Sequence, residues 1–225
     1  MTTCDHSDPG LSAPRELVAP VNNNYLCSSY LLREDIIVTD FGQSFFLDDK
    51  PTDYQPGTAI HYLPPETRYD DKISQASDIW SLACAIFEIR TGFPLFEPIL
   101  GDFLVVKDMI ETLGKLPDPW WNYSEHQKRF EPNGDPRPLE IQRQEGIRLP
   151  AVKSSLRSKL ESVGVDDEPP ETNEGPIIEI TGTRLDEEEI VLLDDLLQKM
   201  LRYLPEDRIT IQEVLQHPWF EYGSS

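Results

Sequence analysis

Two carboxylates bracket one loop of this sequence. Asp40 ends an apolar run and is followed by Phe41 and Gly42, and Glu66 comes after two prolines at the far end of the loop. A strand end that delivers a carboxylate, and a glycine that lets the backbone turn, suit a loop whose position matters and whose ends are fixed. The tripeptide Asp-Phe-Gly is a weak signal by itself, because a chain of this size can contain it by chance.

The elements that must position these residues begin with a β-branched run over residues 35–40, which predicts a short strand. After the loop, nearly every residue from 79 to 89 is apolar, which predicts a helix buried on all sides. Ser77 is the expected N-cap, Asp78 would lie at the positive end of the helix dipole, and Gly92 suits the position after the helix. The sequence therefore predicts a domain built around one buried central helix.

Apolar residues at helical spacing predict further helices over residues 103–113 and 187–201, with a shorter one over 156–163. A capping-box pattern at Thr210 opens a last helix, which is expected to end near His217. Three stretches lack such periodicity: residues 1–24, expected as an extended lead-in, residues 117–150, expected as an irregular insert, and residues 166–175, expected as an acidic linker.

The charge balance argues against some functions. The 225 residues include 41 acidic and 20 basic side chains, for a formal net charge of −21. Such a charge argues against direct binding of nucleic acid, which relies on Lys and Arg to release counterions. It favours solubility, or attraction of a cationic partner. No apolar run approaches the roughly 20 residues that span a bilayer. Three cysteines without regular spacing, and a polar start without an apolar signal region, predict a cytoplasmic or nuclear location.

Four short motifs follow one another in an order typical of one family. Asp40-Phe41-Gly42 is followed by Pro65-Glu66, then by Asp78-Ile79-Trp80-Ser81, and finally by Pro205-Glu206-Asp207-Arg208. This ordered set resembles the C-terminal lobe of a eukaryotic protein kinase. Around the central helix and in Leu95-Phe96-Glu97-Pro98, the chain is most similar to the SR-protein kinases, those of fungi in particular. The similarity covers residues 25–220, apart from the insert and the acidic linker.

The resemblance implies a fold and a domain organisation. The fold would be mainly α, a protein-kinase-like C-terminal lobe with a buried central helix and a few short strands. A partial kinase domain would occupy residues 25–222, after the lead-in of residues 1–24, with the irregular insert extending over about residues 117–185.

The resemblance also implies roles for the loop that starts at Asp40. Asp40 would be the ligand of a magnesium ion that bridges the phosphates of ATP, with Phe41 packed beneath the nucleotide and Gly42 allowing the turn. The alternatives are a turn Asp that caps its own backbone and an ordinary core aromatic. Thr58 and Tyr62 would face the protein substrate, although they are one residue further apart than in the family.

Three further residues would have structural roles. Glu66 and Arg208 would form a buried carboxylate–guanidinium pair that fastens the end of the loop, the alternative being two surface charges. Asp78 would hydrogen-bond the backbone of the catalytic loop, or simply place a negative charge at the start of its helix.

The family activity is transfer of phosphate from ATP to Ser or Thr of proteins, here with Arg/Ser-rich proteins as candidate substrates. The glycine-rich loop, the strand Lys and the catalytic-loop Asp that this transfer needs have no match before Asp40. No catalytic residue is therefore assigned, the chain alone is expected to be inactive, and the surface around Asp40 and Phe41 is expected to be exposed. The alternative is a non-catalytic fragment or pseudokinase that acts as a binding module. The acidic runs at residues 166–168 and 186–189 would attract an Arg-rich partner, or are simply solvated charges.

Overall fold

The computed structural model describes residues 37–49, 54–97, 101–123, 125–165 and 184–223. The chain divides into two compact units, one of Thr39–Glu168 and Ile180–Ser225, and the other of Met1–Val38 and Pro169–Glu179. Ile37 and Val38 are the described residues of the second unit, and both are exposed. The remaining description concerns the first unit.

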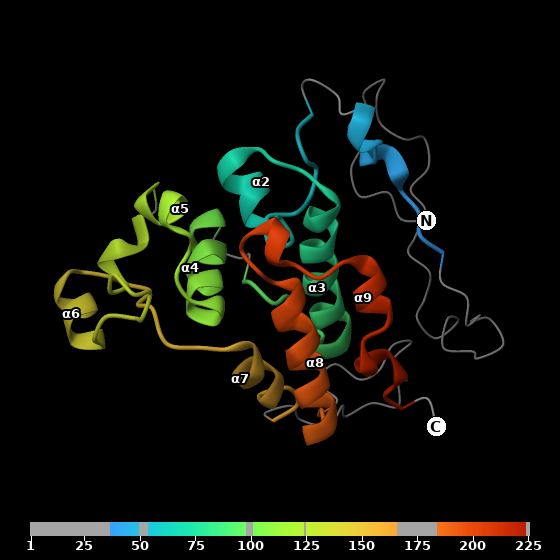
Figure 1. Ribbon diagram of the computed structural model, residues 1–225. Helices are drawn as coiled ribbons and strands as arrows, with labels where there is room; N and C mark the ends of the chain where they lie inside the picture. Colours follow the sequence, from blue (N-terminus) through green and yellow to red (C-terminus); the bar gives the residue numbers. More distant parts are fainter. Residues whose placement is uncertain (1–36, 50–53, 98–100, 124, 166–183, 224–225) are drawn as a thin grey trace, which may run out of the picture. The chain divides into compact units, whose positions relative to one another are not determined.

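The first unit is built from helices, which confirms the prediction of a mainly α fold (Figure 1). The α-helices described are α2 (Pro65–Asp70), α3 (Gln75–Thr91), α4 (Asp102–Leu113), α5 (Asp118–Tyr123), α6 (Leu139–Gln144), α7 (Leu156–Glu161), α8 (Glu187–Met200) and α9 (Ile211–Leu215). The 3-10 helices described are η2 (Phe41–Gln43), η3 (Leu47–Asp49), η4 (Glu125–Lys128), η5 (Pro205–Asp207) and η6 (Pro218–Glu221). None of the described helices is both long and apolar enough to cross a membrane.

The described residues contain no β-strand, and their β-pairing is limited to one antiparallel bridge between Phe130 and Pro136. This part of the chain is therefore mainly helical with almost no β-structure. Residues 37–40 are the described part of the strand predicted at 35–40, and they pair with no neighbouring strand. Asp40 has φ 63° and ψ 56°, a left-handed conformation that is uncommon for a residue other than glycine.

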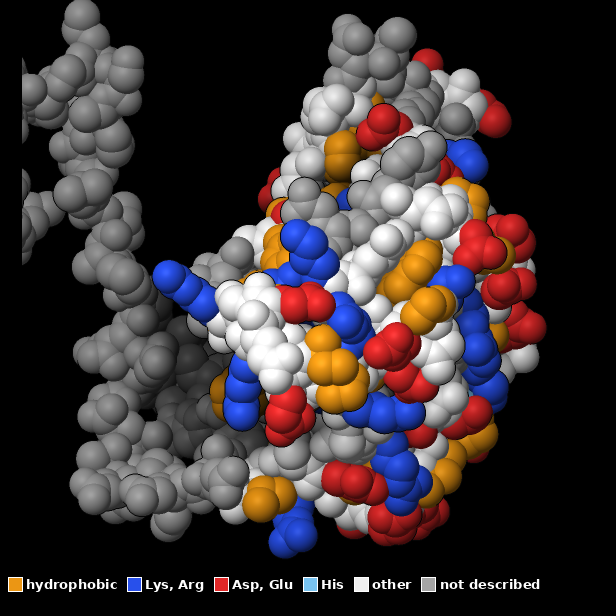
Figure 2. All heavy atoms as spheres, turned by 90° about the vertical axis from the view of Figure 1, so that its left-hand side faces the viewer, with side chains coloured by type: hydrophobic (Ala, Val, Ile, Leu, Met, Phe, Trp, Pro, Cys, Tyr) orange, Lys and Arg blue, Asp and Glu red, His pale blue; other side chains and the backbone are white. Residues whose placement is uncertain are grey.

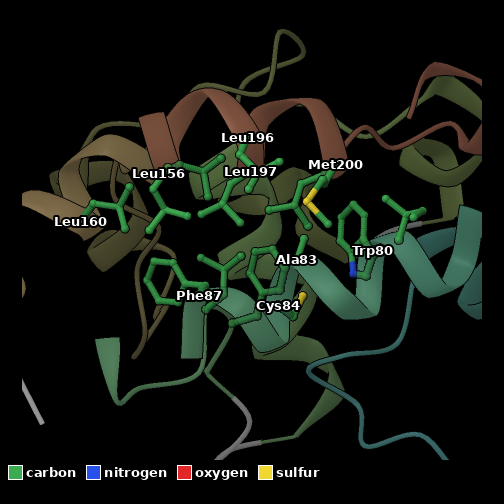
Figure 3. Packing of buried hydrophobic residues seen from close by; sticks show 14 of the residues in the cluster. Trp80, Ala83, Cys84, Phe87, Leu156, Leu160, Leu196, Leu197 and Met200 are labelled. Atoms are coloured by element: carbon green, nitrogen blue, oxygen red, sulfur yellow. The ribbon is translucent and has the colours of Figure 1, made fainter. Parts of the chain in front are cut away.

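α3 is the centre of the main core. Trp80, Ala83, Cys84 and Phe87 are at most 4% exposed, and they pack against apolar side chains of α7 and α8 (Figure 3). The prediction of burial on all sides is wrong at one face, because Ile89 is 78% exposed.

The start of α3 also differs from the prediction. Its N-cap is Ser74, and Ser77 occupies the third helical position instead of the cap. There the Ser77 hydroxyl accepts a hydrogen bond from the Ser74 N–H at 3.0 Å, as in one half of a capping box. The helix therefore begins one turn earlier than the apolar run indicates.

Residues 117–150, expected as an irregular insert, are packed and contain short helices. They contain α5, η4 and α6, and Trp120, Trp121 and Phe130 form a second core cluster with side chains of α4. Gln142 is 0% exposed, and its amide donates to the carbonyls of Arg137 and Ala151 and accepts from the Ala151 N–H, at 2.7–3.0 Å. Aromatic anchors and one buried amide hold this segment together, and neither produces a helical period.

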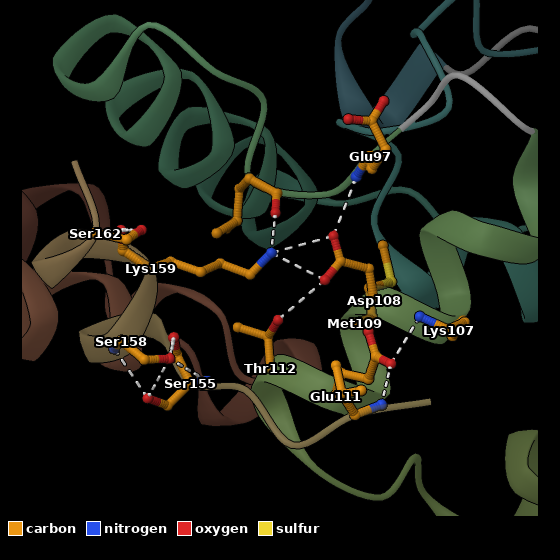
Figure 4. Close-up of polar contacts among 12 residues, drawn as sticks. Glu97, Lys107, Asp108, Met109, Glu111, Thr112, Ser155, Ser158, Lys159 and Ser162 are labelled. Carbon is orange, nitrogen blue, oxygen red and sulfur yellow. Dashed lines mark hydrogen bonds and ion pairs between the residues drawn. The ribbon is translucent and has the colours of Figure 1, made fainter. Parts of the chain in front are cut away.

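A half-buried ion pair joins α4 to α7 (Figure 4). Lys159 Nζ lies 2.9 and 3.2 Å from the two carboxylate oxygens of Asp108 and donates to the Leu95 carbonyl at 3.0 Å. The same carboxylate accepts from the Glu97 N–H at 3.1 Å. One Lys and one Asp therefore connect α7, α4 and the loop that follows α3.

Candidate functional site

A buried ion pair holds the end of the loop that starts at Asp40. Arg208 donates from Nη1 to Glu66 Oε1 at 2.7 Å and from Nη2 to Oε2 at 2.6 Å, so the pair is bidentate. The two side chains are 0% and 2% exposed. The remaining donors of the guanidinium reach backbone carbonyls of Ala76, Arg202 and Tyr203 at 2.7–3.0 Å. All the N–H groups of Arg208 are therefore used inside the protein.

Ser77 connects this pair to the start of α3. Its hydroxyl donates to Glu66 Oε1 at 2.9 Å while it accepts from the Ser74 N–H at 3.0 Å. One hydroxyl thus helps to cap the central helix and to solvate the buried carboxylate. Sequence reasoning missed this contact, and the signal that could have found it is the Ser-x-x-Ser spacing of Ser74 and Ser77.

The residues before Glu66 are tied to the helices around them. The Tyr62 hydroxyl donates to the Glu88 carboxylate, and the Ser81 hydroxyl donates to the Tyr62 carbonyl at 3.0 Å. Arg68 Nη2 donates to the Ile60 carbonyl at 2.8 Å. The hydrogen bond to Glu88, together with burial, raises the pKa of Tyr62 to about 12. Tyr62 therefore lies half-buried against α3, whereas Thr58 is exposed.

Asp40, Phe41 and Gly42 lie on the surface of the unit. Phe41 is 66% exposed, so it does not pack beneath another described element. The turn itself is closed, because the backbone N–H and the hydroxyl of Ser44 both donate to the Phe41 carbonyl, at 3.0 and 2.6 Å. A Cβ at Gly42 would lie 3.6 Å from the Asp40 carboxylate, an ordinary van der Waals contact.

Asp78 lies in the first turn of α3 and is exposed. Desolvation by the surrounding protein nevertheless raises the pKa of its carboxyl group. Of the predicted site residues, the structure brings Glu66 and Arg208 into contact. No hydrogen bond or ion pair between described residues joins Asp40, Thr58 or Asp78 to another of them.

The described residues do not form a complete metal site. In the described ranges no group of three or more His, Cys, Asp or Glu side chains could hold a metal ion. Mg²⁺ is commonly held by one or two carboxylates together with water and the phosphates of a nucleotide. Asp40 can therefore contribute one oxygen ligand, but the described residues alone do not build a nucleotide site.

The model of the protein kinase domain matches residues 22–220 of this chain. The chain belongs to the protein kinase family. This kinase chain is 29% identical over 191 residues to the dual specificity protein kinase CLK1 of Homo sapiens, a match that covers 85% of the chain and 34% of the relative. It is also 31% identical over 189 residues to the dual specificity tyrosine-phosphorylation-regulated kinase 3 of Homo sapiens, covering 83% and 30%.

A third relative is the serine/threonine-protein kinase SRPK of Physarum polycephalum, which is 31% identical to this kinase chain over 164 residues. That match covers 70% of the chain and 32% of the relative. The kinase chain thus spans about a third of the length of these curated relatives.

Proposed function

We propose that this chain supplies the C-terminal lobe of a Ser/Thr protein kinase of the SR-protein-kinase-like type, whose full-length lineage phosphorylates proteins with ATP. The observation that carries the proposal is the bidentate pair of Glu66 and Arg208, buried beside the first turn of α3. It fastens one end of a loop whose other end carries the Asp40 carboxylate. The proposed lobe spans residues 25–222, with an insert over about residues 117–185.

In this proposal, each described residue of the loop has a task. Asp40 would hold Mg²⁺, an ion that neutralises charge on the phosphates of ATP when it is bound. The contacts of Tyr62 with Glu88 and of Ile60 with Arg68 keep the segment before Glu66 against the helices. Thr58, exposed in this segment, would lie on the side that a protein substrate approaches. Arg/Ser-rich proteins are the proposed substrates, and the proposed location is cytoplasmic or nuclear.

We further propose that the 225-residue chain does not transfer phosphate by itself. Phosphoryl transfer depends on several groups that position ATP and neutralise its charge. Among the described residues, Asp40 stands outside any acidic cluster and Phe41 is 66% exposed, which favours an incomplete site. The same observations support the second candidate function, a kinase-derived binding module without catalysis.

Two experiments separate these proposals. The purified 225-residue chain, given Mg-ATP and an Arg/Ser-rich peptide, should incorporate no phosphate, and its melting temperature should not rise with Mg-ATP. Magnesium-dependent phosphorylation by this chain would contradict the proposal that it transfers no phosphate by itself.

The coding sequence upstream of Met1 tests the first proposal. An in-frame glycine-rich loop and His-Arg-Asp motif would allow a longer protein to be expressed. That protein should phosphorylate Ser or Thr and lose this activity with Asp40→Asn. The matched control Asp48→Asn, an exposed Asp of the same loop, should leave the activity unchanged. An active long protein that tolerates Asp40→Asn would refute the assignment of Asp40.

A further inference from the structure

A groove of about 900 Å³ lies between the start of α4 and the loop after α6. Its apolar wall is formed by Phe103 and Leu104 from α4 and by Ile147 and Leu149 from the loop. The Phe103 ring stacks on the buried ring of His126 with centroids 4.5 Å apart, so this wall is supported from behind. Leu149 is 45% exposed, which leaves an apolar surface open to solvent.

The sides of the groove are basic. Lys128, Arg129 and Arg148 line it, and none of them forms an ion pair with another described residue. The acidic side chain among the lining residues is Glu145, and it is already bound by Arg137 at 3.0 and 3.1 Å. Figure 2 shows Lys and Arg side chains interspersed with Asp and Glu on this side of the unit, in a chain that carries 41 acidic and 20 basic residues.

Contacts with Leu149 and Phe103 hold the Arg129 side chain in place in the groove. Its Nε donates to the Leu149 carbonyl at 3.2 Å, and its guanidinium lies 4.5 Å from the centre of the Phe103 ring. A cation over an aromatic ring keeps its charge while its position becomes defined. The groove thus combines one oriented cation, two unpaired ones and an apolar wall.

We propose that this groove docks an acidic peptide segment of a partner protein, with an apolar side chain of that segment seated against Phe103 and Leu149. The proposal goes beyond phosphoryl transfer and does not depend on it. An Arg-rich segment is disfavoured because the positive charges of Lys128, Arg129 and Arg148 would repel it. A long polyanion such as RNA, or an anionic membrane, is disfavoured because it would also meet the rest of a chain with net charge −21. A short acidic segment meets only the local positive charge.

Fluorescence anisotropy with a labelled peptide tests this proposal. The probe is a 12-residue peptide of alternating Glu and Asp with two Leu residues, titrated with the full chain at low and at physiological salt. We expect saturable binding that weakens with salt. Lys128→Ala combined with Arg148→Ala should raise the Kd about five-fold or more, since two attractive charges are lost. Leu149→Ser should also weaken binding. Because this loss comes from apolar contact, its size should change little when salt is added.

The matched control is Lys153→Ala combined with Arg202→Ala. It removes the same charge from two exposed residues outside the groove, so the Kd should not change. Equal Kd values for the groove and control variants would overturn the proposal, and so would tighter binding of a Lys/Arg peptide, of a short RNA or of anionic vesicles. Neutralising the chain's own acidic run (Asp166→Asn, Asp167→Asn, Glu168→Gln) should leave the Kd unchanged. Markedly tighter binding by that variant would instead assign the groove to this chain's own segment.

Discussion

Arg208→Lys is the most informative single substitution, because it keeps the positive charge and removes the planar fork. Arg208 makes two hydrogen bonds to Glu66 and three to backbone carbonyls, all at 2.6–3.0 Å. A lysine ammonium has three donors, so at least two of these five hydrogen bonds are lost. Because Glu66 Oε1 keeps its bond from Ser77, at least one buried acceptor loses its partner. Each buried acceptor left without a partner costs about 1–3 kcal/mol. We therefore expect Arg208→Lys to lower the free energy of unfolding by about 2 kcal/mol or more.

Removing the charge altogether should cost more. Arg208→Ala leaves the Glu66 carboxylate buried without a cation, which typically costs about 3–5 kcal/mol. This is a large part of the roughly 5–15 kcal/mol that holds a domain folded, so the Lys variant is the safer one to purify. The assay is urea denaturation followed by tryptophan fluorescence and circular dichroism.

The matched control for this prediction is Arg157→Lys. Arg157 forms ion pairs with Glu161 and Glu187, but its side chain is 42% exposed. Exposed pairs contribute about 0–1 kcal/mol, so this variant should unfold almost as the parent does. If the two Arg→Lys variants differ by less than about 0.5 kcal/mol, the argument from burial and bidentate geometry is wrong.

Three further predictions follow from other contacts. Tyr62→Phe should destabilise the chain by about 1 kcal/mol at pH 8, because the hydrogen bond to Glu88 is lost. The folded pKa of Tyr62, about 12, lies above the unfolded value, so the stability from this hydroxyl is present below pH 10 and lost as the pH rises towards 12. Denaturation of both proteins at pH 8 and pH 11 tests this. Burial lowers the pKa of His126 to about 4. The stability gained from burying the neutral imidazole is therefore present above pH 6.5 and lost as the pH falls through 4. A titration by NMR that finds this imidazole at an ordinary pKa would contradict the prediction. Gly134→Ala should destabilise the chain by more than about 1 kcal/mol, because its φ is +89° and a Cβ would come within 2.6–2.9 Å of Lys115. The control Gly146→Ala, with φ +76° and nothing within 4 Å of the Cβ, meets the backbone strain alone. Equal losses of stability by the two variants in thermal melts would refute the steric part of the argument.

The helices with a clear apolar period were predictable from the sequence. α4, α7 and α8 begin within a residue of the predicted positions and end within two, because one apolar stripe of each packs on the core. α9 follows the capping box at Thr210, where the Glu213 side chain accepts from the Thr210 N–H at 2.7 Å. These elements are encoded locally, so their residues suffice to find them.

The features that were not predictable depend on contacts distant in the sequence. Gln142 stabilises residues 137–151 through hydrogen bonds to backbone groups, which no periodicity reveals. Tyr62 reaches Glu88, 26 residues away, and this distant contact holds it half-buried against α3. Ile89 belongs to an apolar run but lies 78% exposed, since a run of this kind does not say which neighbours will cover it. The contact of Glu66 with Arg208 was implied by the resemblance to kinases, while the contribution of Ser77 to it was not.

The separation of Glu66 and Arg208 has a consequence for the order in which the protein matures. The two residues are 142 positions apart, so during synthesis the carboxylate is made long before its only described cation. A buried carboxylate without a cation is costly, so Glu66 should stay hydrated while the ribosome adds the intervening helices. A premature stop between the end of α3 at Thr91 and Arg208 would leave α3 intact in sequence but the loop unfastened. Completion of the chain, and not formation of the central helix, is therefore the event that closes this loop.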